Sequence, residues 1–272
     1  MLNLINTYIN SPLDQFEIKL LIGLESPFID MSNISFTSFS LYIIIVLSII
    51  LCLNILTINN NKIIGSKWLL SQEVIYDTII NILKSIIKGN LWGYYYPLIY
   101  TFFIFIFIAN IVSLVPYSFA LTANFILIIS LSFVIWLGIT ILGFYKHGLL
   151  FFSLFVPINT PLILVPLLVI IELLSYIARA ISLGLRLSVN ICAGHLLISI
   201  LSGLLFNLMS ISFISFILGF IPLLIILGVF LLELAIGLIQ SYVWSILIAS
   251  YLKDALYLSL IHISEPTRRV VI

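Results

Sequence analysis

Charge is scarce in this chain. Only 8% of its 272 residues are charged, whereas 63% are hydrophobic. A soluble domain needs about a quarter of its residues charged to cover its surface, so a water-soluble globule is excluded and the lipid bilayer is the suitable solvent. The formal net charge of +1 gives no broad attraction to nucleic acid, and we expect no nucleic-acid partner.

The residues of several common chemistries are also scarce. The two cysteines, Cys52 and Cys192, lie in separate apolar runs and indicate neither a disulfide nor a metal site. The three histidines lack haem or copper spacing. A Gly-rich phosphate loop and a nucleophile elbow are both missing from the sequence. We therefore expect no metal, no cofactor and no nucleotide held by such a loop.

Long apolar runs are abundant and predict an all-α polytopic membrane protein. Each run is long enough to cross about 30 Å of hydrocarbon as a helix. The first three predicted spans cover residues 36–58, 94–115 and 120–145. The second and third are separated by a very short connection, which predicts a helical hairpin.

Two further stretches, residues 167–207 and 212–258, are too long for simple spans. As helices they would measure about 60 to 70 Å, roughly twice the hydrocarbon thickness. The sequence therefore predicts two long C-terminal helices that are strongly tilted or broken, with Pro222 as the candidate kink in the second.

Residues 66–89 have a different pattern, with apolar side chains on one helical face and polar side chains on the other. The apolar face holds Trp68, Ile75, Ile79, Ile82 and Ile86, and the polar face holds Glu73, Asp77, Asn81, Lys84 and Lys88. This pattern predicts an amphipathic helix on the membrane surface, and the alternative is a helix in a water-facing loop.

Charges flanking the first span predict the orientation of the chain. Acidic residues dominate before it, and lysines follow it at positions 62, 67, 84 and 88. The positive-inside rule then places the N-terminus outside and the lysines inside. Lys146 follows the predicted hairpin, which returns the chain to the same side.

The first long helix carries charges that share one face. Glu172, Arg179 and Arg186 are seven residues apart, which is nearly two turns, and Asn190 lies one turn beyond Arg186 on the same side. His195 is nine residues beyond Arg186 and points in roughly the opposite direction. Charges inside a membrane are costly, so they mark candidate functional residues.

The second long helix repeats the arrangement. Glu233, Gln240 and Asp254 are separated by seven and fourteen residues and share a face. If the two long helices pack antiparallel around a short turn, Arg186 and Gln240 fall at a similar depth.

These side chains suit proton transfer. Carboxylates and a histidine at staggered depths are the parts of a proton relay. An arginine does not lose its proton, but it holds a passing carboxylate ionised and repels leaking protons. Structural alternatives stay open: Glu172 as a neutralising partner of Arg179, His195 as a satisfied interior histidine, and Asp254 as a marker of the membrane edge.

Two segments carry a specific resemblance. LLVIIELLSYIARAISLGLRLSVNICAGHLL (residues 167–197) and YVWSILIASYLKDALYL (242–258) resemble subunit a of F-type ATP synthases, in its fungal mitochondrial form. The similarity covers residues 11–258, which we expect to form one membrane domain. Residues 1–10 are then a short leader, and residues 259–272 resemble translated sequencing adapter and are expected to be a non-native tail.

The resemblance implies a proton-translocating stator subunit. Its partners are a rotating c-ring, other membrane and peripheral-stalk subunits and the lipid bilayer, and ATP chemistry takes place on other subunits. It further implies the mitochondrial inner membrane, with the N-terminus in the intermembrane space, and the C-terminus and the lysine segment in the matrix. Protons pass through two offset half-channels against the c-ring.

The resemblance also implies roles for individual residues. Arg186 faces the c-ring carboxylate, and Arg179 is auxiliary. The remaining members are Glu233 and His195 in the half-channel open to the intermembrane space, Asn190 and Gln240 near the ring contact, and Glu172 and Asp254 in the half-channel open to the matrix.

Two other functions compete. A secondary cation/proton antiporter would show an internal repeat, and none is evident. A proton-pumping subunit of a respiratory dehydrogenase would carry buried lysines along its axis, whereas lysines avoid the spans here.

Overall fold

The computed structural model describes residues 13–22, 35–57, 67–87, 91–115, 118–155 and 164–257. Within these ranges the all-α membrane fold is confirmed, with five helical segments long and apolar enough to cross a membrane. They are α2 (Ser38–Thr57), α4 (Trp92–Ser113), α5 (Phe125–His147), α6 (Val165–Met209) and the segment Phe213–Leu256. The predicted leader and the predicted tail lie outside the described residues.

The N-terminal segment pairs with the chain just before α2. After the short helix η1 (Asp14–Phe16), strand β1 (Leu20–Ile22) runs antiparallel to β2 (Phe36–Thr37). Next to them, the Lys19 amide donates to the Ser38 hydroxyl oxygen at 3.1 Å, and the Ser38 amide donates to the Lys19 carbonyl at 2.9 Å. These bonds fix residues 19–22 to the beginning of α2.

The predicted amphipathic helix is confirmed as α3 (Lys67–Ile86). Its C-terminal half packs against α4 and α8, with Ile79 and Leu83 fully buried. Trp68, at the N-terminal end of the predicted apolar face, is 56% exposed. Near the other end of α3, the Lys84 ammonium lies 5.0 Å above the Trp92 ring of α4. The apolar stripe therefore holds α3 to the bundle from Ile75 onward, and Tyr100 of α4 adds a hydrogen bond to Gln72 at 3.1 Å.

The central bundle is formed by α4, α5, α6 and α8 (Phe220–Leu256). Helix α8 packs against all three of the others. The predicted hairpin is corrected in one respect: its arms, α4 and α5, do not pack along each other, and each packs against α8 instead. The short helix η3 (Leu121–Ala123) precedes α5, and Asn124 caps α5 by accepting a hydrogen bond from the Ile126 amide. Helix η4 (Gly148–Phe155) follows α5. Ile99, Ile128, Leu187, Trp244 and Ile248 are among the buried side chains of the core.

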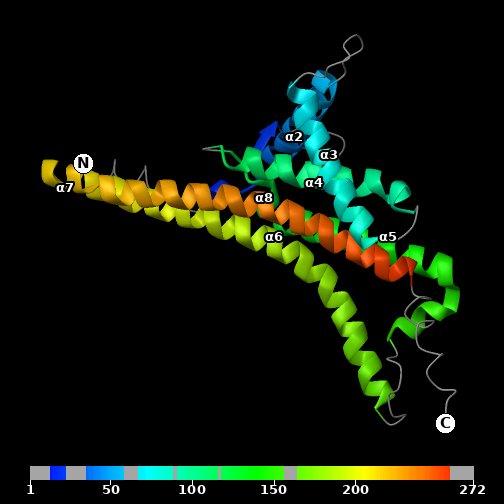
Figure 1. Cartoon of the computed structure of the whole chain (residues 1–272). Helices are drawn as coiled ribbons and strands as arrows, with labels where there is room; N and C mark the ends of the chain where they lie inside the picture. Colours follow the sequence, from blue (N-terminus) through cyan, green and yellow to red (C-terminus); the bar gives the residue numbers. More distant parts are fainter. Residues whose placement is uncertain are drawn as a thin grey trace, which may run out of the picture.

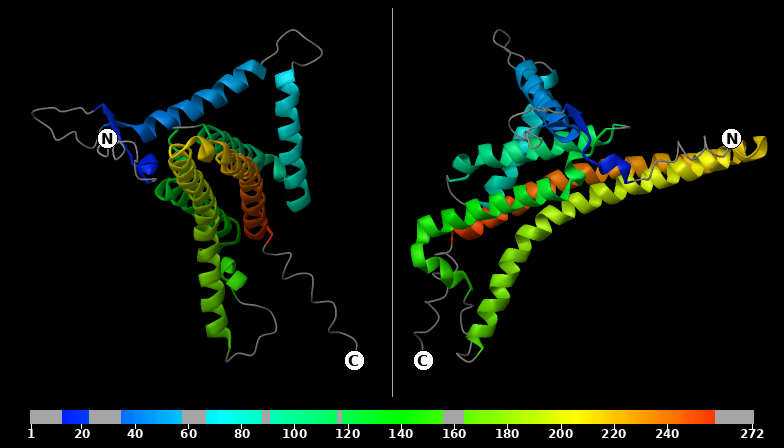
Figure 2. Two further views of the ribbon diagram at one scale, coloured as in Figure 1. Left: turned by 90° about the vertical axis from the view of Figure 1, so that its left-hand side faces the viewer. Right: turned by 180° about the vertical axis from the view of Figure 1, so that it is seen from behind.

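The two long C-terminal helices behave differently. Helix α6 is one helix of 45 residues, about 68 Å long, and Figures 1 and 2 show that its N-terminal part curves away from α8. The second is divided at Gly219 into α7 (Phe213–Leu218) and α8. Pro222 lies in the first turn of α8, where its ring crowds the carbonyl of Leu218 and its nitrogen cannot donate. The break therefore falls within one turn of the predicted kink.

Candidate functional site

Helices α6 and α8 run antiparallel and are joined by two contacts between ionisable side chains. His195 Nε2 of α6 lies 3.5 Å from Glu233 Oε1 of α8. Arg179 Nη1 of α6 lies 3.8 Å from Asp254 Oδ2 of α8. The two contacts lie 16 residues apart on α6, or about 24 Å along the helix axis.

The His195–Glu233 pair is deeply enclosed. The side chains are 13% and 3% exposed, and within the described part of the chain neither His195 Nε2 nor the Glu233 carboxylate oxygens form a hydrogen bond. Gly194 makes room for the carboxylate, because a Cβ at that position would lie 2.8 Å from Glu233 Cδ. A buried carboxylate beside an imidazole can take up and release a proton. The pair thus has the parts of a relay.

Arg179 bridges two carboxylates. Its Nη2 lies 3.6 Å from Glu172 Oε1 on its own helix, in addition to the contact with Asp254. The three side chains are 39%, 40% and 42% exposed in the isolated chain. The Glu172–Arg179 pairing that the sequence left open is present, and Asp254 adds a partner that spacing alone did not reveal.

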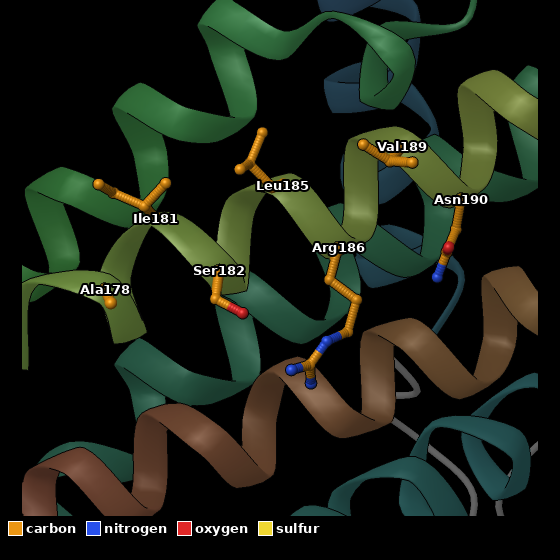
Figure 3. A pocket seen from close by; sticks show the side chains of 7 residues that line it. All are labelled: Ala178, Ile181, Ser182, Leu185, Arg186, Val189 and Asn190. Atoms are coloured by element: carbon orange, nitrogen blue, oxygen red, sulfur yellow. The ribbon is translucent and has the colours of Figure 1, made fainter. Parts of the chain in front are cut away.

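Arg186 lies on α6 between the His195–Glu233 pair and the group of Glu172, Arg179 and Asp254, which we call the Arg179 cluster. It lines a hollow of about 450 Å³ along α6. Among the residues that the structure describes, no carboxylate pairs with its guanidinium. Arg186 and Asn190 extend from α6 in the same direction, as their spacing predicted (Figure 3). The hollow is otherwise lined by small and apolar side chains, namely Ala178, Ile181, Ser182, Leu185 and Val189.

The expectation that Gln240 and Arg186 lie at a similar depth stays a prediction. The two contacts that join α6 and α8 bracket both residues, but they span 16 residues of α6 and 21 residues of α8, so they do not pair Gln240 with a particular residue of α6.

One polar residue of the bundle was missed in the sequence. Asn110 of α4 is 2% exposed, and its Nδ2 donates to the Gly237 carbonyl of α8 at 2.9 Å. Gly237 lies one turn from Glu233, so this bond fixes the depth of α8 beside the His195–Glu233 pair. The available signal was a lone amide inside an apolar span, which is weaker than a charge.

Together, a multi-pass helical bundle, an enclosed carboxylate–imidazole pair and an arginine without a carboxylate partner in the described chain define an ion-translocating membrane subunit. Comparison with known proteins gives the family. Residues 40–253 match the ATP synthase A chain family, and the chain belongs to it. This confirms the proton-translocating ATP synthase subunit predicted from the sequence and gives no support to an antiporter.

Similar proteins occur in several yeasts. The chain is 66% identical over 255 residues to ATP synthase subunit a of Kluyveromyces lactis, covering 94% of this chain and the whole relative. It is 66% identical over 258 residues to ATP synthase subunit a of Saccharomyces cerevisiae, covering 95% of this chain and the whole relative. The identity to the Yarrowia lipolytica protein of the same name is 50% over 253 residues, covering 93% and 99% of the two chains.

Proposed function

We propose that this chain conducts protons through two offset half-channels against a rotating c-ring and so couples proton flow to ATP synthesis. The observation that carries this proposal is the order of groups along the α6–α8 pair. The Arg179 cluster lies at one end, the His195–Glu233 pair lies about 24 Å away, and Arg186 lies between them without a carboxylate partner in the described chain.

Each group then has a chemical task. Glu233 and His195 pass protons between the intermembrane space and a carboxylate on the ring. Arg186 holds that carboxylate ionised after it has lost its proton, because the opposite charge favours the ionised form. Glu172 and Asp254 conduct the released proton to the matrix, and Arg179 holds these two carboxylates together.

Two further amides belong to the ring contact. Asn190 extends from α6 on the same side as Arg186, and Gln240 lies on α8 between Glu233 and Asp254. They are uncharged, so they can bond to the ring carboxylate in either protonation state. The catalytic chemistry of ATP stays on other subunits of the complex.

Half-channels that open on opposite sides can be tested with cysteines. In a chain with Cys52 and Cys192 replaced by serine, we expect Glu233→Cys to react with a small water-soluble thiol reagent from the intermembrane-space side. We expect Glu172→Cys to react from the matrix side. Modification is measured by mass spectrometry of the assembled complex, so it does not depend on activity. Equal reactivity of either cysteine from both sides would rule out offset half-channels.

The orientation of the chain is part of the proposal. We infer a multi-pass subunit of the mitochondrial inner membrane with its N-terminus in the intermembrane space, its C-terminus in the matrix and α3 on the matrix side, in contact with other membrane and peripheral-stalk subunits. The supporting observation is the distribution of lysines, because Lys84 is exposed in the last turn of α3, after the first span, and Lys146 is exposed in the last turn of α5. Lys62 and Lys88 lie outside the described residues.

Lysine labelling tests this orientation. A membrane-impermeant biotin reagent should label Lys84 and Lys146 only from the matrix side of sealed vesicles. Lys19 is exposed before the first span and is the internal control, because it should be labelled only from the opposite side. Labelling of Lys84 from the same side as Lys19 would reverse the proposed placement of α3.

A further inference from the structure

A segment before the first span contacts the buried His195–Glu233 pair. The Phe16 ring lies edge-on to the His195 ring, with centroids 6.4 Å apart and planes at 80°. Phe16 is half-buried and packs against the main apolar cluster of the bundle. Figure 2 shows the dark blue segment before α2 beside α6. A residue before the first span thus contacts the central histidine of the site.

This contact is held in place by the hydrogen bonds described above. Residues 19–22 are bonded to the beginning of α2 through β1, β2 and the two bonds between Lys19 and Ser38. The described segment 13–22, which we call the cap segment, is therefore fixed at one end to α2 and rests at its other end on His195. Because both ends are held, Phe16 has a defined position.

The cap segment also brings a polar group into the interior. The Nε2 atom of Gln15, next to Phe16, is buried and has no hydrogen-bond partner within the described residues.

His195 is 13% exposed, with Glu233 of α8 on one side and Phe16 on another. An edge-to-face aromatic contact restricts rotation of the imidazole ring. That rotation would carry Nε2 away from the Glu233 carboxylate.

We propose that the cap segment covers the His195–Glu233 pair and that Phe16 is a positioning residue, which holds the imidazole toward Glu233 and narrows the path by which protons reach it. This inference rests on the proposed function, because it assigns a task to Phe16 only if the pair carries protons. It adds a boundary to that half-channel, formed by a part of the chain outside the long helices.

The first test compares two phenylalanines. Phe16→Ala should lower proton-driven ATP synthesis about threefold in a normally assembled complex, because one aromatic contact is lost. Phe16→Tyr retains the ring and should stay near the unmodified rate. Phe39→Ala is the matched control: Phe39 is also half-buried and makes an edge-to-face contact at 6.4 Å, but with Phe119 and not with a titratable group of the site. If Phe16→Ala does not assemble, Phe16→Leu takes its place with the same expectation.

The second test asks whether position 16 borders the proton path. Phe16→Cys and Phe39→Cys are made in the assembled complex lacking Cys52 and Cys192, and both are treated with a bulky, cationic, membrane-impermeant methanethiosulfonate. Proton flux is compared with each variant's own rate before treatment. We expect modification of the Phe16→Cys variant to remove most of the flux and modification of the Phe39→Cys variant to leave it unchanged. A purely structural role of Phe16 would not produce this difference.

The outcomes separate this inference from the proposed function. Complete modification of the Phe16→Cys variant without loss of flux, or equal effects of Phe16→Ala and Phe39→Ala, would refute the cap while leaving the half-channels intact. Failure of the proposed function itself would appear in Arg186→Ala, which does not touch the cap segment.

Discussion

Replacing Arg186 with alanine should abolish proton-driven ATP synthesis, with a loss of at least about 100-fold, while the complex still assembles. Arg186 is the cation between the His195–Glu233 pair and the Arg179 cluster, and no carboxylate of the described chain neutralises it. A bare guanidinium in a membrane is costly, and the proposed partner is the carboxylate of the c-ring. Without that charge, the ring carboxylate would no longer be held ionised, and its proton would not be released.

Two variants serve as comparisons for this result. Arg186→Lys should fail nearly as badly, because an ammonium group lacks the planar fork of arginine and can lose its proton when it is desolvated. Arg179→Lys should be milder, because that position is partly exposed and has Glu172 and Asp254 beside it. The measurement is ATP synthesis in energised vesicles, with assembly followed on native gels. Assembly with near-normal synthesis in Arg186→Ala would contradict the mechanism.

Glu233→Leu should have the second largest effect, lowering proton-driven synthesis about 100-fold because a positioned proton-transfer group is lost. Leucine keeps the space beside Gly194 filled with an apolar side chain while the carboxylate beside His195 is removed, and native gels check that the complex still assembles. Proton uptake from the intermembrane space is the step that should slow. ATP-driven proton pumping in vesicles, measured beside synthesis, should fall in parallel.

Ser245→Ala is the matched control for Glu233→Leu. Ser245 is also buried in α8, but its hydroxyl donates to the Tyr242 carbonyl of its own helix and takes no part in the charged contacts. Its loss should change neither synthesis nor pumping appreciably. If Glu233→Leu behaves like Ser245→Ala, then Glu233 is not in the proton path.

Much of the fold follows from the sequence because the bilayer leaves few choices. A long apolar run must satisfy its backbone internally, and in this chain that means a helix. The helical period then fixes direction around the axis, which is why the sequence placed Arg186 and Asn190 on one side. The expectation that His195 points the opposite way from this face did not allow for a curved helix, since His195 and Arg179 both contact α8. The excessive lengths of the last two segments predicted long helices, and Pro222 marked the break to within a turn.

The contacts between distant segments could not be read in the same way. The Arg179–Asp254 and Asn110–Gly237 contacts depend on how far one helix slides along another, and apolar periodicity is nearly unchanged when a helix shifts by one turn. The contact of Phe16 with His195 joins residues nearly 180 positions apart. The pattern of the short segment before the first span does not indicate which helix it contacts.

The separation between the His195–Glu233 pair and the Arg179 cluster also determines where along the bundle the membrane potential does its electrical work. A proton that crosses the whole potential releases about 2.3 kcal/mol per 100 mV. If water reaches both clusters, as proposed, the voltage falls mainly across the stretch between them, where Leu187, Ile191 and Ile248 are buried. The electric field in that stretch is therefore stronger than its average over the bilayer. In the proposed mechanism Arg186 repels a proton on the direct route, so this work would be delivered while the proton travels with the ring carboxylate.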